Sequence, residues 1–186
     1  MKPLLILLSG LLLSAGFAES KVEHRAASDT YTAPEVNVSF PADIGSFRKN
    51  EVSRSYNPMI GTKIRYSDPE GFCADVYIYS LPDGKKEISP AALKKHYDEL
   101  KQAILALSSQ GLSLKNVTLS GEKTENRSGL QVYSANFQLV WSDGKTQESS
   151  LTLFAYKGQI IKLRVSSAKE NANLFADAII KLFPKI

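Results

Sequence analysis

The chain is poor in the residues that disulfides and metal sites require. It contains one cysteine and two histidines among 186 residues. No intramolecular disulfide can therefore form, and the usual cysteine and histidine ligands of a zinc site are too few. The single thiol, Cys73, is expected to be a small buried hydrophobic residue, with an exposed reactive thiol as the alternative. We expect no metal and no other cofactor, and a fold that is held together by its core alone.

Recognisable catalytic patterns are also missing. The sequence has no G-x-S-x-G, Walker or G-x-G-x-x-G motif, and no pair of acidic residues spaced for glycoside hydrolysis. His24 lies in a polar segment, and His96 lies on the flank of an expected helix, where a surface position is favoured over a catalytic base. The chain is thus expected to be non-catalytic, and a hydrolase with an unfamiliar site remains an alternative.

A long apolar run occurs only at the start of the chain. Leu4–Leu13 is largely apolar, follows the positive Lys2 and precedes the small residues of Gly16–Ala18. This order is typical of a secretory signal peptide that is cleaved after Ala18. A membrane-spanning helix needs about 20 apolar residues, so an anchor is less favoured. We expect residues 1–18 to be a signal peptide, the mature protein to be periplasmic or secreted, and no transmembrane segment to remain.

The net charge is small once the expected signal peptide is removed. Lys2 is the only charge in that segment, so the +4 of the whole chain becomes +3. Most basic residues occur as short pairs with acids nearby, which indicates a solvated surface and argues against a nucleic-acid partner. Residues 19–34 are polar and aperiodic and are expected to be flexible. Residues 35–186 have the length and apolar content of one domain. Three sequons would matter only in a eukaryotic host: Asn37, Asn116 and Asn126.

The segment Asp68–Gly71 predicts a β-hairpin. Its Pro and Gly suit a type I turn followed by a left-handed residue, which gives a three-residue loop with a bulge. That loop fixes the register of the two strands and sorts their apolar side chains onto one face. Three pairs then lie opposite each other: Ile64 with Val76, Tyr66 with Ala74, and Arg65 with Asp75. Tyr77 and Tyr79 share the face of the Arg65 and Asp75 pair.

Two amphipathic helices are expected. Ser89 and Pro90 predict the start of a helix that runs to about Ser109 and is ended by Gly111. Its buried stripe is Leu93, Tyr97, Leu100, Ile104 and Leu107. Ser167–Glu170 has the pattern of a capping box and predicts a second helix that ends before Pro184. Its buried stripe is Leu174, Phe175, Ala178, Ile179 and Leu182.

Three strands between these helices are predicted to form a meander, and Val36–Phe40 an earlier strand. Asp143-Gly144 and Lys157-Gly158 are interpreted as two-residue turns. With those registers, one apolar face carries Tyr133, Ala135, Phe137, Leu139, Trp141, Thr152, Phe154, Tyr156, Ile161, Leu163 and Val165. The other face is partly apolar and includes Lys162 and Arg164. Such a sheet needs cover on both faces, which the two helices provide.

This order of elements resembles the Mog1/PsbP-like group over about residues 36–184. The resemblance rests on the Asp68–Gly71 hairpin, the middle helix, the meander before Ile160–Val165 and the closing helix that runs into Leu182–Pro184. It implies an α+β fold in which helices cover both faces of an antiparallel sheet. It further implies an accessory or binding role toward a larger partner, without naming any functional residue.

One cluster on the first hairpin is the candidate binding site: Arg65, Asp75, Tyr77 and Tyr79. A cross-strand ion pair beside two partly buried tyrosines is the structural explanation of this cluster. A patch that binds a ligand or a partner is the functional one, because aromatic residues and Arg anchor interfaces. We expect an exported accessory domain that binds an envelope protein. A periplasmic domain that binds a small molecule or lipid is the alternative.

Overall fold

The computed structural model describes residues 22–25, 29–82, 87–110 and 113–184. The expected signal peptide lies outside these residues, and so does Gly111. In chain order the elements are β1 (Val22–Arg25), β2 (Tyr31–Ala33), β3 (Val38–Phe40), β4 (Asp43–Ile44), β5 (Phe47–Ser55), β6 (Thr62–Ser67), β7 (Cys73–Tyr79), α1 (Pro90–Leu105), a 3-10 turn (Ala106–Ser109), β8 (Leu114–Arg127), β9 (Leu130–Trp141), β10 (Thr146–Tyr156), β11 (Gln159–Ser166) and α2 (Lys169–Lys181).

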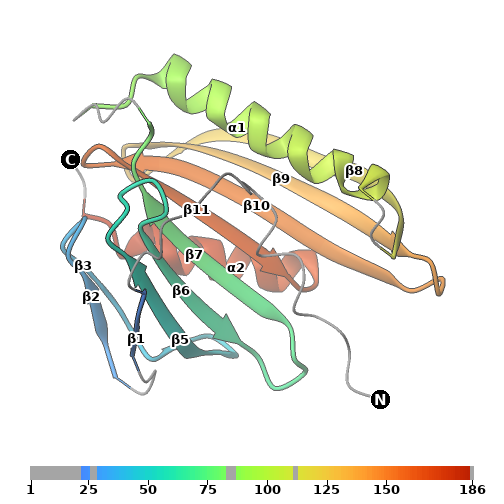
Figure 1. Ribbon diagram of the computed structural model, residues 1–186, viewed down its shortest axis with the longest axis horizontal. Helices are drawn as coiled ribbons and strands as arrows, with labels where there is room; N and C mark the ends of the chain where they lie inside the picture. Colours follow the sequence, from blue (N-terminus) through green and yellow to red (C-terminus); the bar gives the residue numbers. More distant parts are fainter. Residues whose placement is uncertain (1–21, 26–28, 83–86, 111–112, 185–186) are drawn as a thin grey trace.

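Within the described residues, a nine-stranded antiparallel sheet forms the centre of the fold, with one helix on each face (Figure 1). The strand order is β1-β5-β6-β7-β11-β10-β9-β8, and β4 pairs with β5 beside this path. β2 and β3 form a separate two-stranded sheet. The expected α+β class and the helices on both faces are confirmed.

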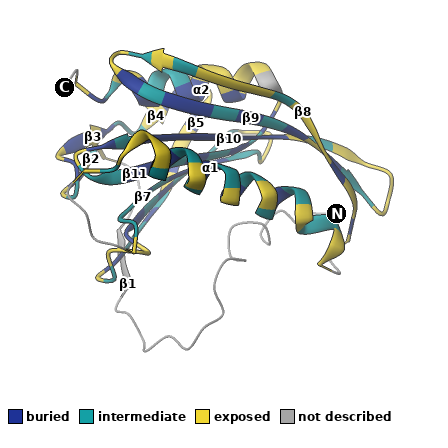
Figure 2. Cartoon of the chain, turned by 90° about the horizontal axis from the view of Figure 1, so that it is seen from above, coloured by how far each residue is buried: buried dark blue, intermediate teal, exposed yellow. Residues whose placement is uncertain are grey.

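Two hydrophobic cores lie on the two faces of the sheet. On one face α2 packs over the apolar sides of β5, β6, β7 and β11, where Phe175 contacts the rings of Phe47 and Tyr66. On the other face α1 packs over β8, β9 and β10 through Leu93, Tyr97 and the residues around them. Figure 2 shows exposed residues on α1 alternating with buried and half-buried ones, as expected of a helix with one buried side.

The first hairpin has the predicted register. Ile64 pairs with Val76, Tyr66 with Ala74, and Arg65 with Asp75. The turn is held by a hydrogen bond from the Asp68 amide to the Phe72 carbonyl (3.0 Å), and Gly71 has the left-handed φ of 89° that the bulge requires.

The predicted register between β9 and β10 is wrong by one residue. The amide of Trp141 donates to the carbonyl of Lys145 (2.8 Å), so the turn has three residues, with Gly144 left-handed, where two were expected. A shift of one residue moves a whole side of a strand to the other face. The buried side chains on one side of β9 therefore lie under α1, on the opposite face from Phe154 and Tyr156: Tyr133, Ala135, Phe137 and Leu139. The Lys157-Gly158 turn has the predicted two residues.

The predicted start of α2 is also wrong. No capping box forms, because Ala168 is the N-cap residue and the hydroxyl of Ser167 is buried without a hydrogen-bond partner among the described residues. The helix is rotated relative to the prediction, so that Leu174 is 62% exposed. Its buried residues are Ala172, Phe175, Ala176, Ile179 and Ile180. For α1, the Ser89 hydroxyl accepts from the Ala92 amide (3.2 Å), as a cap at this position should.

Two expectations about exposure are corrected. Part of the segment 19–34 is ordered, because β1 pairs with β5, β2 pairs with β3 and Ala33 is fully buried. Cys73 is half-buried and not a core residue, because it starts β7 at the hairpin end, where Ser67 lies beside it.

Candidate functional site

Arg65 and Asp75 form a two-point ion pair across β6 and β7. Arg65 Nε donates to Asp75 Oδ1 at 2.7 Å, and Nη2 donates to Oδ2 at 2.9 Å. The two side chains are only 18% and 8% exposed. The hydrogen bonds with Asp75 raise the pKa of Arg65 further above its ordinary value. Because β6 and β7 are neighbours joined by a tight hairpin, the sequence alone was sufficient to predict this contact.

The two tyrosines of β7 continue this face towards α1. The Tyr77 hydroxyl donates to Asp75 Oδ2 at 3.4 Å, and the Tyr79 hydroxyl lies 2.8 Å from His96 Nε2. Burial raises the pKa of both tyrosines, and the Asp75 carboxylate also raises that of Tyr77. His96 was expected on the surface but is half-buried, because it turns from α1 onto Tyr79. Burial lowers the pKa of His96, with Glu99 acting in the opposite direction.

Strand β11 adds Lys162 to the same face. β11 pairs with β7 so that Lys162 lies opposite Tyr77. Its ammonium stands 4.1 Å from the centre of the Tyr77 ring and 5.6 Å from that of Tyr79. Both rings offer their electron-rich faces to the cation. No carboxylate forms an ion pair with Lys162 within the described residues.

Arg164 lies two residues further along β11, opposite Asp75. It reaches away from Asp75, and its Nη2 donates to the Ser149 hydroxyl at 3.0 Å. The guanidinium carbon is 5.8 Å from the centre of the Phe137 ring. Its Nη1 is buried and has no hydrogen-bond partner among the described residues. Burial lowers the pKa of Arg164, although a guanidinium remains protonated at neutral pH.

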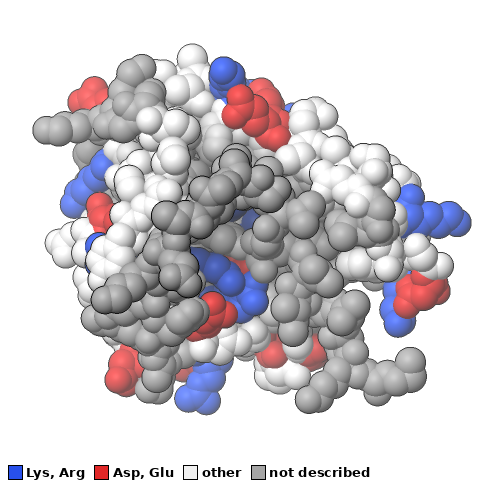
Figure 3. Space-filling model, in the orientation of Figure 1, with Lys and Arg blue, Asp and Glu red and all other residues white. Residues whose placement is uncertain are grey.

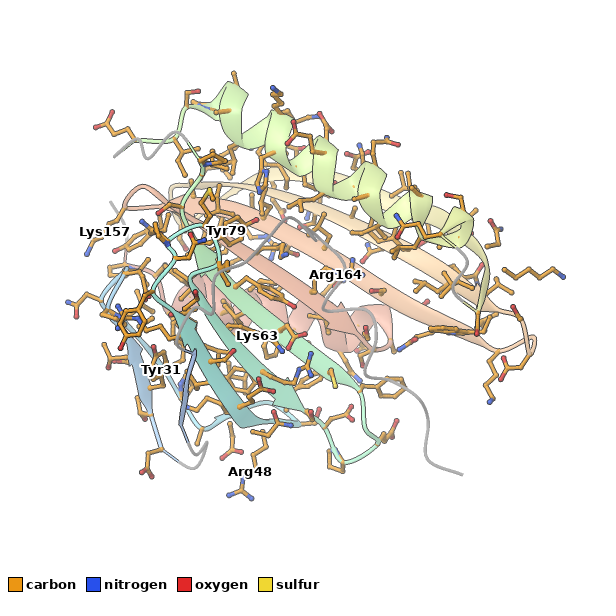
Figure 4. All side chains as sticks on the ribbon, in the orientation of Figure 1. Tyr31, Arg48, Lys63, Tyr79, Lys157 and Arg164 are labelled. Carbon is orange, nitrogen blue, oxygen red and sulfur yellow. The ribbon has the colours of Figure 1, made fainter. Side chains whose placement is uncertain are left out.

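We call the resulting surface the β7/β11 patch. Its members are Lys63, Arg65, Asp75, Tyr77, Tyr79, Lys162 and Arg164. Lys63 marks its edge, where the ammonium lies 3.8 Å from a Glu51 carboxylate oxygen. In Figure 3 blue basic atoms with red acidic atoms beside them lie near the centre of this face. Figure 4 shows Lys63, Tyr79 and Arg164 on β6, β7 and β11, on the side of the sheet next to α1.

The four predicted residues therefore lie together, and sequence reasoning missed Lys162 and Arg164 as members of the site. The alternation of charged and apolar residues in β11 predicted that Lys162 and Arg164 share one face of the sheet. It did not predict that this face lies beside Tyr77. The pairing of β7 with β11 joins segments about 80 residues apart, and no local pattern specifies it.

The chemistry of the patch suits binding. The patch contains four cations, two phenols and a single carboxylate, Asp75, which is already held by Arg65. No group of three or more His, Cys, Asp or Glu side chains that could hold a metal ion is found in the described part of the chain. Arg and Tyr are among the side chains most often found as anchors in protein interfaces.

Lys162 makes the stability of the fold depend on pH. Burial, reinforced by Arg164 and opposed by Asp75, lowers the pKa of Lys162 from 10.5 to about 8. Between these values the unfolded chain binds more protons than the folded one, so the unfolding free energy rises with pH from about 8 to 10.5. Deprotonation of Tyr77 and Tyr79 in the unfolded state acts in the opposite direction above about pH 10, while His96 titrates at lower pH.

The substitution Lys162→Met is accordingly expected to raise the unfolding free energy at pH 7, on the order of 1 kcal/mol. This gain should shrink as the pH approaches 9.5, because the wild-type lysine loses its charge. Urea unfolding of both proteins at pH 7, 8, 9 and 9.5 measures the difference. A gain that is independent of pH, or a loss of stability at pH 7, would contradict this assignment.

The architecture described above is that of the PsbP-like fold group. The solved structure of cyanobacterial PsbP (CyanoP) from Synechocystis sp. PCC 6803 is similar to this chain over 93% of both chains, with a TM-score of 0.50 and 13% sequence identity. At this identity the similarity concerns the fold. No protein-family model matches the chain, and no curated protein sequence matches it. None of the described helices combines the length and apolar character needed to cross a membrane.

Proposed function

We propose that this protein is an exported accessory domain that binds a protein partner of the cell envelope through the β7/β11 patch. The single observation that carries the proposal is the patch itself, which places four cations and two tyrosines on one face of the sheet. Export is supported by the signal-peptide pattern of residues 1–18. An accessory role is supported by the PsbP-like fold, because the resemblance to that group implies a non-catalytic domain that serves or binds a larger partner.

The patch is preorganised, which favours binding. Arg65 is fixed by two hydrogen bonds to Asp75, and Tyr79 by its contact with His96. Side chains that are already held in one conformation lose little entropy when a partner binds. A partner that covers the patch gains from aromatic and Arg contacts that are in place beforehand.

A small molecule or lipid between the layers is the alternative function. The space between α1 and the sheet is filled by side chains such as Leu93, Tyr97 and Phe137, and the space between α2 and the sheet by Phe175 and Ile179. The observations therefore favour the surface over the interior as the place of binding.

The proposal predicts that a charge reversal at the edge of the patch reduces partner capture. Wild-type protein, Lys63→Glu and Lys145→Glu are used as bait for envelope extract of the host under mild crosslinking. Wild type and Lys145→Glu should return the same protein, and Lys63→Glu should return about tenfold less of it. Lys145 is the matched control because it is 80% exposed on the turn between β9 and β10.

Unfolding midpoints of the three baits must agree, so that lost capture reports binding and not unfolding. Equal capture by all three baits would show that the partner does not bind through the patch. If the wild-type bait captured no reproducible partner, the proposed accessory role itself would be contradicted.

A further inference from the structure

Lys162 and Arg164 form no ion pair with any carboxylate among the described residues, although Asp75 attracts both of them. Half-buried or buried charges are normally paired, because removing them from water is costly. The nearest carboxylate, Asp75, is committed to Arg65 through both of its oxygens. Burial disfavours the charged form of both cations of β11, and the charge of Arg164 further disfavours that of Lys162. The fold thus tolerates an unfavourable arrangement at this position.

Two donors at the same position have no hydrogen-bond partner among the described residues. One amino group of Arg164 is engaged by Ser149, whereas the buried Nη1 has no partner in the described part of the chain. The Lys162 ammonium is held over two aromatic rings and makes no hydrogen bond to the described residues. An oxyanion that reached both groups would accept a charge-assisted hydrogen bond from each of them.

We propose that Lys162 and Arg164 form a carboxylate subsite of the β7/β11 patch, which receives a Glu or Asp side chain from an acidic segment of the protein partner. This inference rests on the proposed function for the identity of the partner. A carboxylate is favoured over a phosphate because Arg164 offers Nη1 alone and not a free two-pronged edge. The tyrosine rings beside the charges suit the methylene groups of an acidic side chain.

The test uses defined peptides in place of the partner. A capped peptide of alternating Glu and Gly residues is titrated into the exported domain by calorimetry, with a peptide carrying Gln in place of Glu and with inorganic phosphate as separate probes. The proteins are wild type, Lys162→Met, Arg164→Met and the control Lys145→Met.

Wild type and Lys145→Met should bind the Glu peptide with equal affinity, and Lys162→Met and Arg164→Met should bind it at least about tenfold more weakly. The Gln peptide should bind none of them measurably. Lys162→Met is expected to be more stable than wild type, so its loss of binding cannot be attributed to unfolding. In addition, saturation with the Glu peptide should raise the pKa of Lys162, followed by NMR of its side-chain carbon next to nitrogen.

Two results would overturn the subsite: equal affinity of the Glu and Gln peptides, or unchanged Glu-peptide affinity in both methionine variants. If phosphate bound more tightly than the peptide, with the same dependence on Lys162, the ligand of this position would be a small anion and not an acidic segment of a protein. Failure here leaves the partner capture by wild type and its loss in Lys63→Glu intact. Failure of partner capture alone would contradict the proposed function and leave the peptide subsite standing.

Discussion

Gly61→Ala is expected to lower the unfolding free energy by about 3 kcal/mol or more, or to prevent folding. Gly61 has a φ of 63° and ends the loop that enters β6. A methyl group at this position would lie 1.9 Å from the carbonyl oxygen of Ile78 and 3.0 Å from the Cα of Tyr79. Both are backbone atoms of a paired strand and cannot turn aside, so β6 and β7 would have to separate at this end. Urea unfolding of the variant measures the loss.

Gly45→Ala separates the steric clash from the backbone conformation. Gly45 has nearly the same φ of 59°, but no atom lies within 4 Å of the position that a Cβ would occupy. Its replacement by Ala should lower the unfolding free energy only by the penalty for a left-handed backbone at a non-glycine residue, about 1–2 kcal/mol. Equal losses of unfolding free energy in the two variants would show that a steric clash with Ile78 contributes nothing to the effect of Gly61→Ala.

Arg65→Met is expected to lower the unfolding free energy by about 3 kcal/mol, because it leaves the buried Asp75 carboxylate without its partner. Asp75→Asn alone should cost a comparable amount, since it leaves the Arg65 guanidinium with a neutral neighbour. The double variant buries neither charge without its partner, and it should therefore be more stable than the sum of the two single losses predicts. We expect a coupling energy of about 1–3 kcal/mol from urea unfolding of all four proteins.

A coupling energy near zero would contradict the contact. The same four proteins also separate structure from function. If the pair only stabilises the fold, the double variant should unfold at lower denaturant concentration yet capture the envelope partner normally. If the pair belongs to the binding surface, adding a Tyr77 substitution should abolish capture while changing the unfolding midpoint little further.

Two hairpins show why one register was predictable and the other was not. Asp68–Gly71 contains a proline, which fixes the turn, and the predicted loop length is correct. Asp143-Gly144 fits a two-residue turn equally well, but Gly144 serves as the left-handed third residue of a longer loop. Since both faces of β9 carry apolar residues, hydrophobic alternation could not reveal the error. Because of this error, the prediction placed Phe137 and Arg164 on opposite faces of the sheet, whereas Phe137 lies beneath Arg164.

Strands β5 and β8 were missed for a related reason. β8 is an edge strand with mostly exposed polar residues, and its partner β9 supplies the pairing that its own composition does not favour. β5 contains the buried Lys49, whose ammonium donates to the Phe40 carbonyl at 3.1 Å, and an irregularity between Lys49 and Glu51 breaks its alternation. Both strands are defined by tertiary contacts that a local pattern does not contain.

The pairing of β7 with β11 has a consequence for the order of folding. The strands from β5 to β7 and those from β8 to β11 form two meanders, in which each strand pairs with its neighbour in the sequence. Among the described strands, β7 with β11 is the one ladder that joins the two meanders. Local contacts form before distant ones because they close shorter loops. Asp75 and Tyr77 come from one meander, and Lys162 and Arg164 from the other. We therefore expect the proposed carboxylate subsite to be created by the last sheet pairing to form, and a chain caught before that step to have no affinity for an acidic ligand at this position.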